Sequence, residues 1–181
     1  SVGVPLPSTD IKLVDSNGLE VALGKEGELL VKGPQVMKGY WRNTVETEKV
    51  LQDGWFKTGD IAKVDEDGMV YIVDRKKDMI IVSGFNVYPN EVEGVISMLP
   101  EVSEVAVVGE ASDNSGEIVK ACVQLNDVIS SDDIIKHCKL HLTGYKVPKK
   151  VVFHKELPKT NVGKVLRREL RTESTKSNSE A

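Results

Sequence analysis

Residues 74–93 read DRKKDMIIVSGFNVYPNEVE and separate two different sequence patterns. The charged start of this stretch is followed by a short β run, 79–82, and then by the turn at Ser83 and Gly84. Pro89 comes where the first turn of a helix tolerates proline. A charged joint next to a glycine turn suits a hinge beside a loop that a ligand can approach closely. A plain surface connector between two strands explains the same residues equally well.

The residues before this stretch predict a β-rich unit. A turn signal such as Asp-Glu-Asp-Gly at 65–68 is typical of a hairpin. One short helix is expected at 43–51, where Asn43 and Thr44 are candidate caps. We expect strands at 10–14, 27–33, 56–64 and 69–73. Short strands joined by tight turns favour a small barrel or a curled sheet.

The residues after this stretch predict a smaller α+β unit. Apolar side chains recur after Pro89 at the spacing of one helical face: Val92, Val95, Ile96 and Leu99. Further helices are expected from 130–133 onward and at 165–171, and strands are expected at 102–108, 118–125 and 150–154. The fold class is therefore α+β, with a three-stranded sheet and flanking helices in the second unit.

Composition restricts the class of protein. With 181 residues, of which 40% are hydrophobic and 29% charged, the chain is typical of a soluble globular protein of one or two domains. No apolar run approaches the roughly 20 residues of a membrane-spanning helix. The chain shows no signal peptide and does not begin with methionine, so we expect a piece of a longer protein. Cys122 and Cys138 lack metal spacing and are expected to be buried free thiols of a cytosolic protein.

Charge is distributed unevenly along the chain. The formal net charge is −4, yet residues 145–171 hold nine Lys and Arg against Glu156 and Glu169, a net charge of +7. A basic segment in an acidic protein suggests an anionic ligand such as a phosphate, although a solvated basic face is the alternative. Nucleic acid is not expected, because the segment lacks interleaved aromatic residues and matches no nucleic-acid-binding module.

Two residues of the first unit could hold a ribose. Asp60 follows a Thr-Gly turn at the start of a strand, and its two oxygens match two neighbouring hydroxyls. Arg75 offers a planar fork of donors to ribose or phosphate oxygens. Taken singly, Asp60 is more simply a turn aspartate, and Arg75 the partner of a neighbouring carboxylate.

Two residues of the second unit could also face a ligand. Gly84 permits the close passage of a thin ligand, although a plain hairpin turn is as good an explanation. Lys164 ends the loop at 157–164, LPKTNVGK, and its mobile charge could stabilise a phosphate or carboxylate in a transition state. A solvated lysine is the alternative. The loop lacks the first glycine of a Walker A motif, and the sequence shows neither a catalytic triad nor metal-like histidine spacing.

Taken together and in order, these motifs resemble those of acyl-adenylating ligases, the group that includes acyl-CoA synthetases, luciferases and peptide-synthetase adenylation domains. The run from 53–61 to 74–77 looks like the fatty-acyl-CoA synthetase signature. Residues 83–93 and 142–148 resemble bacterial long-chain fatty acid–CoA ligases, and the resemblance covers residues 1–172.

The resemblance implies a role for each candidate residue. Asp60 and Arg75 would hold the ribose hydroxyls of ATP and of the acyl-adenylate. Lys77 would be the hinge. Lys164 would contact the acid carboxylate and the α-phosphate during adenylation, and Gly84 would line the pantetheine tunnel during thioester formation.

The resemblance also implies a domain division and a reaction. Residues 1–74 would be the β-rich subdomain of a larger N-terminal domain, 75–172 a mobile C-terminal lid domain, and 173–181 a disordered tail. The substrates would be a fatty acid, ATP and CoA, with AMP and pyrophosphate released. Mg²⁺ would be bound by residues upstream of this chain, as would the acyl chain, so the chain alone is expected to be inactive.

Three alternatives stay open from the sequence. The acid could be aryl, short-chain or amino acid, because the acyl pocket would lie upstream. The chain could instead be a standalone binding or regulatory module whose basic segment docks a carrier or a membrane surface. A cytoplasmic location is expected, with peripheral contact at the inner membrane face left open, and the sequence does not predict an oligomeric state.

Overall fold

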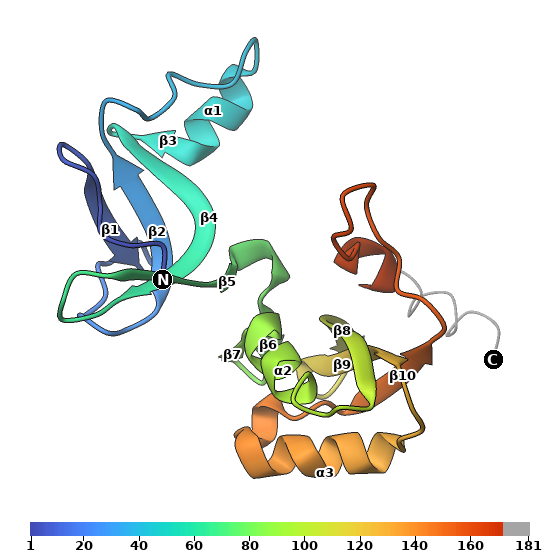
Figure 1. Ribbon diagram of the computed structural model, residues 1–181. Coiled ribbons are helices and arrows are strands. Elements are labelled where there is room, and N and C mark those ends of the chain that lie inside the picture. Colours follow the sequence, from blue (N-terminus) through green and yellow to red (C-terminus); the bar gives the residue numbers. More distant parts are fainter. Residues whose placement is uncertain (172–181) are drawn as a thin grey trace. The chain divides into compact units, whose positions relative to one another are not determined.

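The computed structural model describes residues 1–171 (Figure 1). The chain divides into two compact units, one ending at Lys77 and the other beginning at Asp78. The expected tail, 173–181, and the expected domain end at 172 lie outside the described residues. In the described part, no helix is long and apolar enough to cross a membrane.

The first unit is an antiparallel sheet with one short helix. The strand order is β1-β2-β4-β3, and β5 pairs with β4 as well. The strands are β1 (Asp10–Val14), β2 (Gly27–Lys32), β3 (Leu51–Gln52), β4 (Trp55–Val64) and β5 (Val70–Arg75). Buried side chains on four of these strands form the core of this unit: Leu13, Leu29, Ala62 and Val70. The expected β-rich unit and its strands are therefore observed.

Helix α1 (Thr44–Val50) begins where the sequence predicts. The side chain of its N-cap, Asn43, accepts a hydrogen bond from the Glu46 N–H at 3.1 Å. This bond satisfies a donor that has no partner within the helix. Asn43, rather than Thr44, is therefore the capping residue.

The second unit is built on a five-stranded sheet rather than the expected three-stranded one. The strand order is β10-β9-β6-β7, with β8 also paired to β9. The strands are β6 (Ile80–Val82), β7 (Phe85–Val87), β8 (Val102–Ser112), β9 (Gly116–Leu125) and β10 (Lys150–His154). The three strands expected for this sheet correspond to β8, β9 and β10; the β run expected at 79–82 is β6, which joins the sheet together with its hairpin partner β7. Strand β10 runs parallel to β9, and the other pairs are antiparallel.

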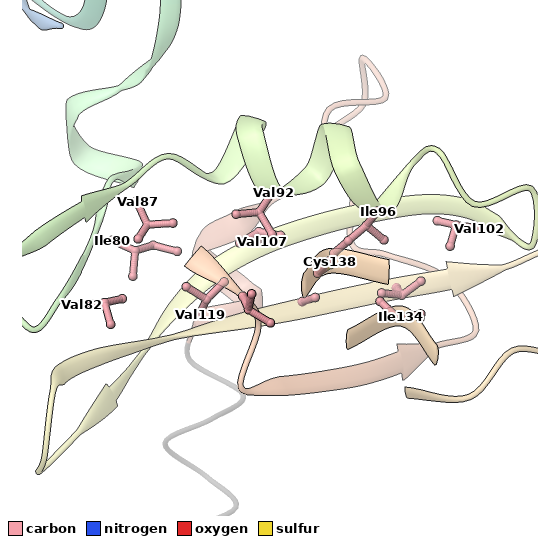
Figure 2. Packing of buried hydrophobic residues seen from close by; sticks show 13 residues of the cluster. Ile80, Val82, Val87, Val92, Ile96, Val102, Val107, Val119, Ile134 and Cys138 are labelled. Atoms are coloured by element: carbon pink, nitrogen blue, oxygen red, sulfur yellow. The ribbon is translucent and has the colours of Figure 1, made fainter. Parts of the chain in front are cut away.

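Two helices of this unit contribute to its main core. Val92 and Ile96 from α2 (Pro89–Ile96) and Ile134 and Cys138 from α3 (Ser131–His141) are fully buried. Figure 2 shows Val92 and Ile96 directed from α2 toward the strands. The expected start of α3 is confirmed, because the Ser130 side chain accepts a hydrogen bond from the Asp133 N–H.

The opposite face of the same sheet is covered by the segment 157–171. Alternate strand residues face this second, smaller core, because successive side chains of a strand point to opposite faces. They are Ala106, Val108 and Cys122, and Leu157 and Leu170 pack on them. The last described residues, 167–171, are helical, two residues later than the expected start at 165. Cys122 and Cys138 are buried free thiols, as predicted.

Candidate functional site

Asp60 and Arg75 lie opposite each other on strands β4 and β5. The Arg75 guanidinium donates a hydrogen bond from Nη1 to Asp60 Oδ1. The turn before Asp60 is fixed as well: the Asp60 N–H donates to Thr58 Oγ1 at 3.1 Å, and the Thr58 hydroxyl donates to the Leu29 carbonyl at 2.8 Å. The two candidate ribose ligands are thus neighbours on one rigid sheet, with carboxylate and guanidinium side by side.

A hollow of about 350 Å³ lies next to this pair. It is lined by Thr58, Gly59, Arg75, Lys76 and Lys77, so three cations border it. The Lys76 ammonium donates to Glu28 Oε2 at 2.7 Å, and Glu28 is buried. Lys77 follows as an exposed residue of a short 3₁₀ turn, η1 (Lys76–Asp78), and is the last residue of the first unit.

Gly84 lies in the tight turn between β6 and β7. Ser83 and Gly84 both have positive φ, 50° and 84°, as a type I′ hairpin turn requires. A Cβ placed on Gly84 would meet nothing within 4 Å, so its surface is open. Beside the turn, the rings of Phe85 and Tyr145 stack with centroids 4.8 Å apart. The hairpin turn left open by the sequence is therefore present, and a ligand role for Gly84 stays a prediction.

Lys164 ends a closed turn rather than a loose loop. The Thr160 N–H donates to the Lys164 carbonyl at 2.8 Å, and the Lys164 N–H donates to Thr160 Oγ1 at 3.1 Å. Gly163 supports the turn with a φ of 80° and donates to the Thr160 carbonyl at 2.9 Å. The Lys164 side chain is exposed. The backbone of Lys164 is therefore held in place while its ammonium faces solvent.

Cations of the basic segment 145–171 pair with carboxylates from other parts of the second unit. The ion pairs include Lys146 with Glu91, Lys150 with Glu110, Lys159 with Glu104 and Arg167 with Glu93. Much of the positive charge thus belongs to the internal structure of this unit. Among residues 1–171, no carboxylate lies within ion-pair distance of the Lys164 ammonium, which leaves that charge available to an anion.

Sequence reasoning missed the acidic residues that surround Arg167. Lys164 shares a hollow of about 300 Å³ with Glu93, Val105, Ala106, Val165 and Arg167. The sequence places Glu93 only near a helix start and gives no sign that Glu93 or Asp78 meets Arg167. The one signal is the net charge of +7 at 145–171, because any buried cation of this segment needs a carboxylate from elsewhere.

The five predicted site residues divide between the two units. Asp60, Arg75 and Lys77 belong to the first, whereas Gly84 and Lys164 belong to the second and lie on separate turns. Each unit therefore carries its own part of the predicted site. The rings of His137 and His141 lie with centroids 4.7 Å apart and planes tilted by 50°, and among residues 1–171 no three His, Cys, Asp or Glu side chains gather as a metal site would need.

The fold and these motifs match known enzymes. Residues 91–164 match the family model of the AMP-binding enzyme C-terminal domain, and residues 1–41 match the AMP-binding enzyme model. Each of the two units thus matches one model of AMP-binding enzymes. The chain is also similar to bacterial long-chain-fatty-acid–CoA ligases.

The relatives share high identity over nearly all of this chain. The ligase of Yersinia pestis is 58% identical over 177 residues, which is 97% of this chain and 32% of the relative. The ligase of Salmonella typhimurium is 60% identical over 175 residues, 96% of this chain and 31% of the relative. The chain thus spans about a third of the length of the curated relatives it matches.

Solved structures share the fold. ATP-bound MatB from Rhodopseudomonas palustris has a TM-score of 0.88 at 39% identity, over 94% of this chain and 35% of that protein. The o-succinylbenzoate CoA synthetase of Bacillus subtilis, in complex with its acyl-adenylate intermediate, has a TM-score of 0.85 at 37% identity, over 92% of this chain and 34% of that protein. These neighbours are adenylating enzymes with the same mixed fold.

Proposed function

We propose that this chain is the C-terminal part of an ATP-dependent long-chain fatty acid–CoA ligase. The overall reaction converts a fatty acid, ATP and CoA into fatty acyl-CoA, AMP and pyrophosphate. The observation that carries the proposal is the 58–60% identity to ligases of that name over almost the whole chain. The first unit supplies Asp60 and Arg75, which suit a ribose, and the second supplies the exposed Lys164 ammonium; such a reaction needs both.

Lys164 is proposed to act in the first half-reaction. There, a carboxylate oxygen of the acid attacks the α-phosphorus of ATP, and pyrophosphate leaves. Two anions must approach each other, so a cation that bridges them offsets their repulsion and stabilises charge in the transition state. An exposed ammonium on a fixed backbone turn suits this task, because it is placed by the turn and is not neutralised by a neighbouring carboxylate.

Asp60 and Arg75 are proposed to hold the ribose of the nucleotide in both half-reactions. An ionised carboxylate can accept from two hydroxyl groups, and a guanidinium can donate to a hydroxyl oxygen. Their mutual hydrogen bond orients both before the nucleotide arrives, which reduces the entropy lost on binding.

The second half-reaction is proposed to use the turn at Ser83 and Gly84 in place of the Lys164 turn. The CoA thiol attacks the acyl carbonyl carbon, its proton is lost, and AMP leaves. Lys164 has no task in this step, whereas the open surface of Gly84 suits a narrow thiol-bearing chain. We propose that Lys77, at the boundary between the units, is the hinge that exchanges one turn for the other.

Replacement of Lys164 tests this assignment in the complete enzyme. In Lys164→Ala, adenylation should fall by about 10²–10³-fold, because a charge contact to the transition state is lost. Thioester formation from supplied acyl-adenylate should stay within a few-fold of wild type. Pyrophosphate release measures the first step and thioester formation the second. Lys155→Ala is the matched control, since Lys155 is another exposed lysine of the same basic segment. An equal loss of both half-reactions in Lys164→Ala would refute the role.

A ligase for another carboxylic acid is the second candidate. The long-chain ligase of Bacillus subtilis is 47% identical to this chain, and the feruloyl-CoA synthase of Amycolatopsis is 46% identical. Relatives named for different acids thus resemble this part of the enzyme almost equally. The higher identity to enterobacterial long-chain ligases favours a fatty acid. Competition between palmitate and ferulate in the complete enzyme would decide which acid is the substrate. A preference for ferulate would replace the fatty acid with an aryl acid in the proposed reaction.

We place the reaction in the cytoplasm, where ATP and CoA are available. The two buried free thiols fit a reducing compartment.

A further inference from the structure

Arg167 lies three residues after Lys164 and is the centre of a set of polar contacts within the second unit. Its Nη2 donates to both Glu93 oxygens at 2.8 Å, and its Nε donates to Glu93 Oε1 at 3.3 Å. Nη2 also donates to Asn90 Oδ1 at 3.0 Å. Nη1 lies 3.6 Å from Asp78 Oδ2. The guanidinium therefore meets three side chains whose positions in the sequence are 74 to 89 residues away.

These partners belong to well-anchored elements. Asn90 and Glu93 lie on α2, whose buried side packs into the main core. Glu93 Oε1 also accepts a hydrogen bond from the Val107 N–H of β8 at 2.8 Å. The side chains of Arg167, Glu93 and Asp78 are only 23%, 17% and 16% exposed. A paired network with so little solvent contact is rigid, since a guanidinium fork and a carboxylate allow few relative orientations.

The network and Lys164 share one hollow. Glu93, Arg167 and Lys164 all line the 300 Å³ depression beside β8. The turn that carries Lys164 has its own hydrogen bonds, and on its N-terminal side Lys159 pairs with Glu104 of β8 at 2.8 Å. Residues 165–167 continue directly from it, so the Arg167 fork is the nearest polar anchor to the rest of the unit on the C-terminal side of Lys164.

We propose that Arg167 is a positioning residue for Lys164, and that its bonds to Glu93, Asn90 and Asp78 fix the Lys164 turn to α2 and β8. The inference rests on the proposed role of Lys164 in adenylation. Arg167 itself contacts no substrate in this account. With the fork in place, Lys164 moves with the second unit as one body, and its ammonium reaches the same point each time the unit is in its adenylating position. Without the fork, the turn keeps only the Lys159 anchor on its N-terminal side, and Lys164 is displaced for the first half-reaction alone.

The test uses the complete enzyme and measures the two half-reactions separately. Wild type must first form acyl-adenylate and convert supplied acyl-adenylate to thioester; failure of both would refute the proposed ligase function rather than this inference. In Arg167→Met, kcat for adenylation should fall by about 10- to 100-fold, the effect of a displacement of roughly 1 Å at a reacting group. Thioester formation should stay within about twofold of wild type, because Lys164 has no task in that step.

Two further variants separate positioning from charge. Arg167→Lys should recover part of the lost adenylation rate, because one ammonium can still reach one Glu93 oxygen but cannot form the fork. Glu93→Gln should lower adenylation less than Arg167→Met, since its amide oxygen can still accept from the Val107 N–H. Both should spare thioester formation.

A stability-matched control separates positioning from general loss of structure. Ile134→Val removes one buried methyl group on α3 and should lower the melting temperature. Ile134 makes none of the hydrogen bonds of the Arg167 network. At 25 °C it should keep both half-reactions near wild type. The inference is overturned if Arg167→Met keeps adenylation within twofold of wild type, if it loses both half-reactions together, or if Ile134→Val loses adenylation to the same extent.

Discussion

Asp60 and Arg75 pair across neighbouring strands, and the pairing fixes the direction of both side chains. A carboxylate offers about four lone-pair sites and a guanidinium five N–H donors, so one bond between them leaves capacity for a ligand. The structural explanation, an ion pair, and the functional one, a ribose site, are therefore compatible. In the absence of a ligand, the hydrogen bond between Arg75 and Asp60 orients both side chains.

Cys138 gives a pH-dependent prediction at the scale of one residue. Burial raises the pKa of its thiol from 9.0 to about 11. Between these values the unfolded chain releases the thiol proton while the folded chain keeps it, so stability falls as pH rises. This contribution is fully present below pH 9 and is lost as the pH rises toward 11. The shift corresponds to up to about 3 kcal/mol.

The measurement is urea unfolding of the chain at several pH values between 8 and 11. Wild type should lose stability more steeply with pH than Cys138→Ala, which has no thiol to ionise. Cys138→Ala is less stable at pH 8 because it leaves a small cavity, so the slopes rather than the absolute values are compared. Parallel slopes would show that the buried thiol contributes nothing to the pH dependence.

The sequence predicted which residue types stand at the candidate site, because they lie in short continuous motifs. Asp60 in its Thr-Gly-Asp turn and Lys164 after Gly163 can be found by reading a few neighbouring letters. The surroundings of Arg167 could not be found in this way, since Glu93 lies 74 positions away and meets it only through the fold. Local patterns carry no information about which carboxylate a distant arginine will meet.

At the scale of elements, the second sheet shows what periodicity can and cannot predict. Strands β8, β9 and β10 are five or more residues long and rich in apolar side chains, and all three were predicted. Strands β6 and β7 have three residues each, and β6 joins β9 through the single pair Val82 and Gly116. The β run at 79–82 was predicted as well, but its membership of this sheet was not, because that depends on a contact far along the chain.

The segment 157–171 gives a prediction at this scale. Lys120 is buried on β9, and its ammonium donates to the Leu170 carbonyl at 2.8 Å and lies 3.4 Å from Glu110 Oε2. It therefore ties the end of the segment to the sheet. Lys120→Met should lower the free energy of unfolding by about 1–3 kcal/mol, because a hydrogen bond to a charged donor is lost in a buried place.

Lys150→Met is the control for this change in urea unfolding. Lys150 bonds the same carboxylate, Glu110, at 2.9 Å, but its side chain is 42% exposed. Its loss should lower the free energy of unfolding by less than about 1 kcal/mol, as for other exposed ion pairs. Hydrogen exchange at residues 160–171 should rise in Lys120→Met and not in Lys150→Met. Equal effects of the two changes would show that burial of Lys120 does not matter.

At the scale of the whole molecule, the chain consists of two units with separate cores. The boundary falls at the end of a run of three consecutive cations, Arg75 to Lys77, that the sequence marks by its charge. In an exposed, charged joint, a backbone N–H that loses its protein partner during a motion can form a hydrogen bond with water instead. In a buried apolar joint the same N–H would be left without a partner. Charge and the change of periodicity could therefore predict the boundary region, whereas the motion of one unit against the other is a proposal about the complete enzyme.

A proline at the joint tests that motion. Lys77→Pro fixes φ near −65° and removes an N–H donor at the last residue of the first unit. In the complete enzyme it should hold the second unit in one position. We expect adenylation to persist and thioester formation from supplied acyl-adenylate to fall by at least about tenfold, because the exchange of the Lys164 turn for the Gly84 turn is blocked. Lys77→Ala is the matched control, since it removes the charge and leaves the backbone free, and it should retain both half-reactions. Unimpaired thioester formation in Lys77→Pro would rule out a hinge at this residue, and an equal loss in Lys77→Ala would assign the effect to charge instead.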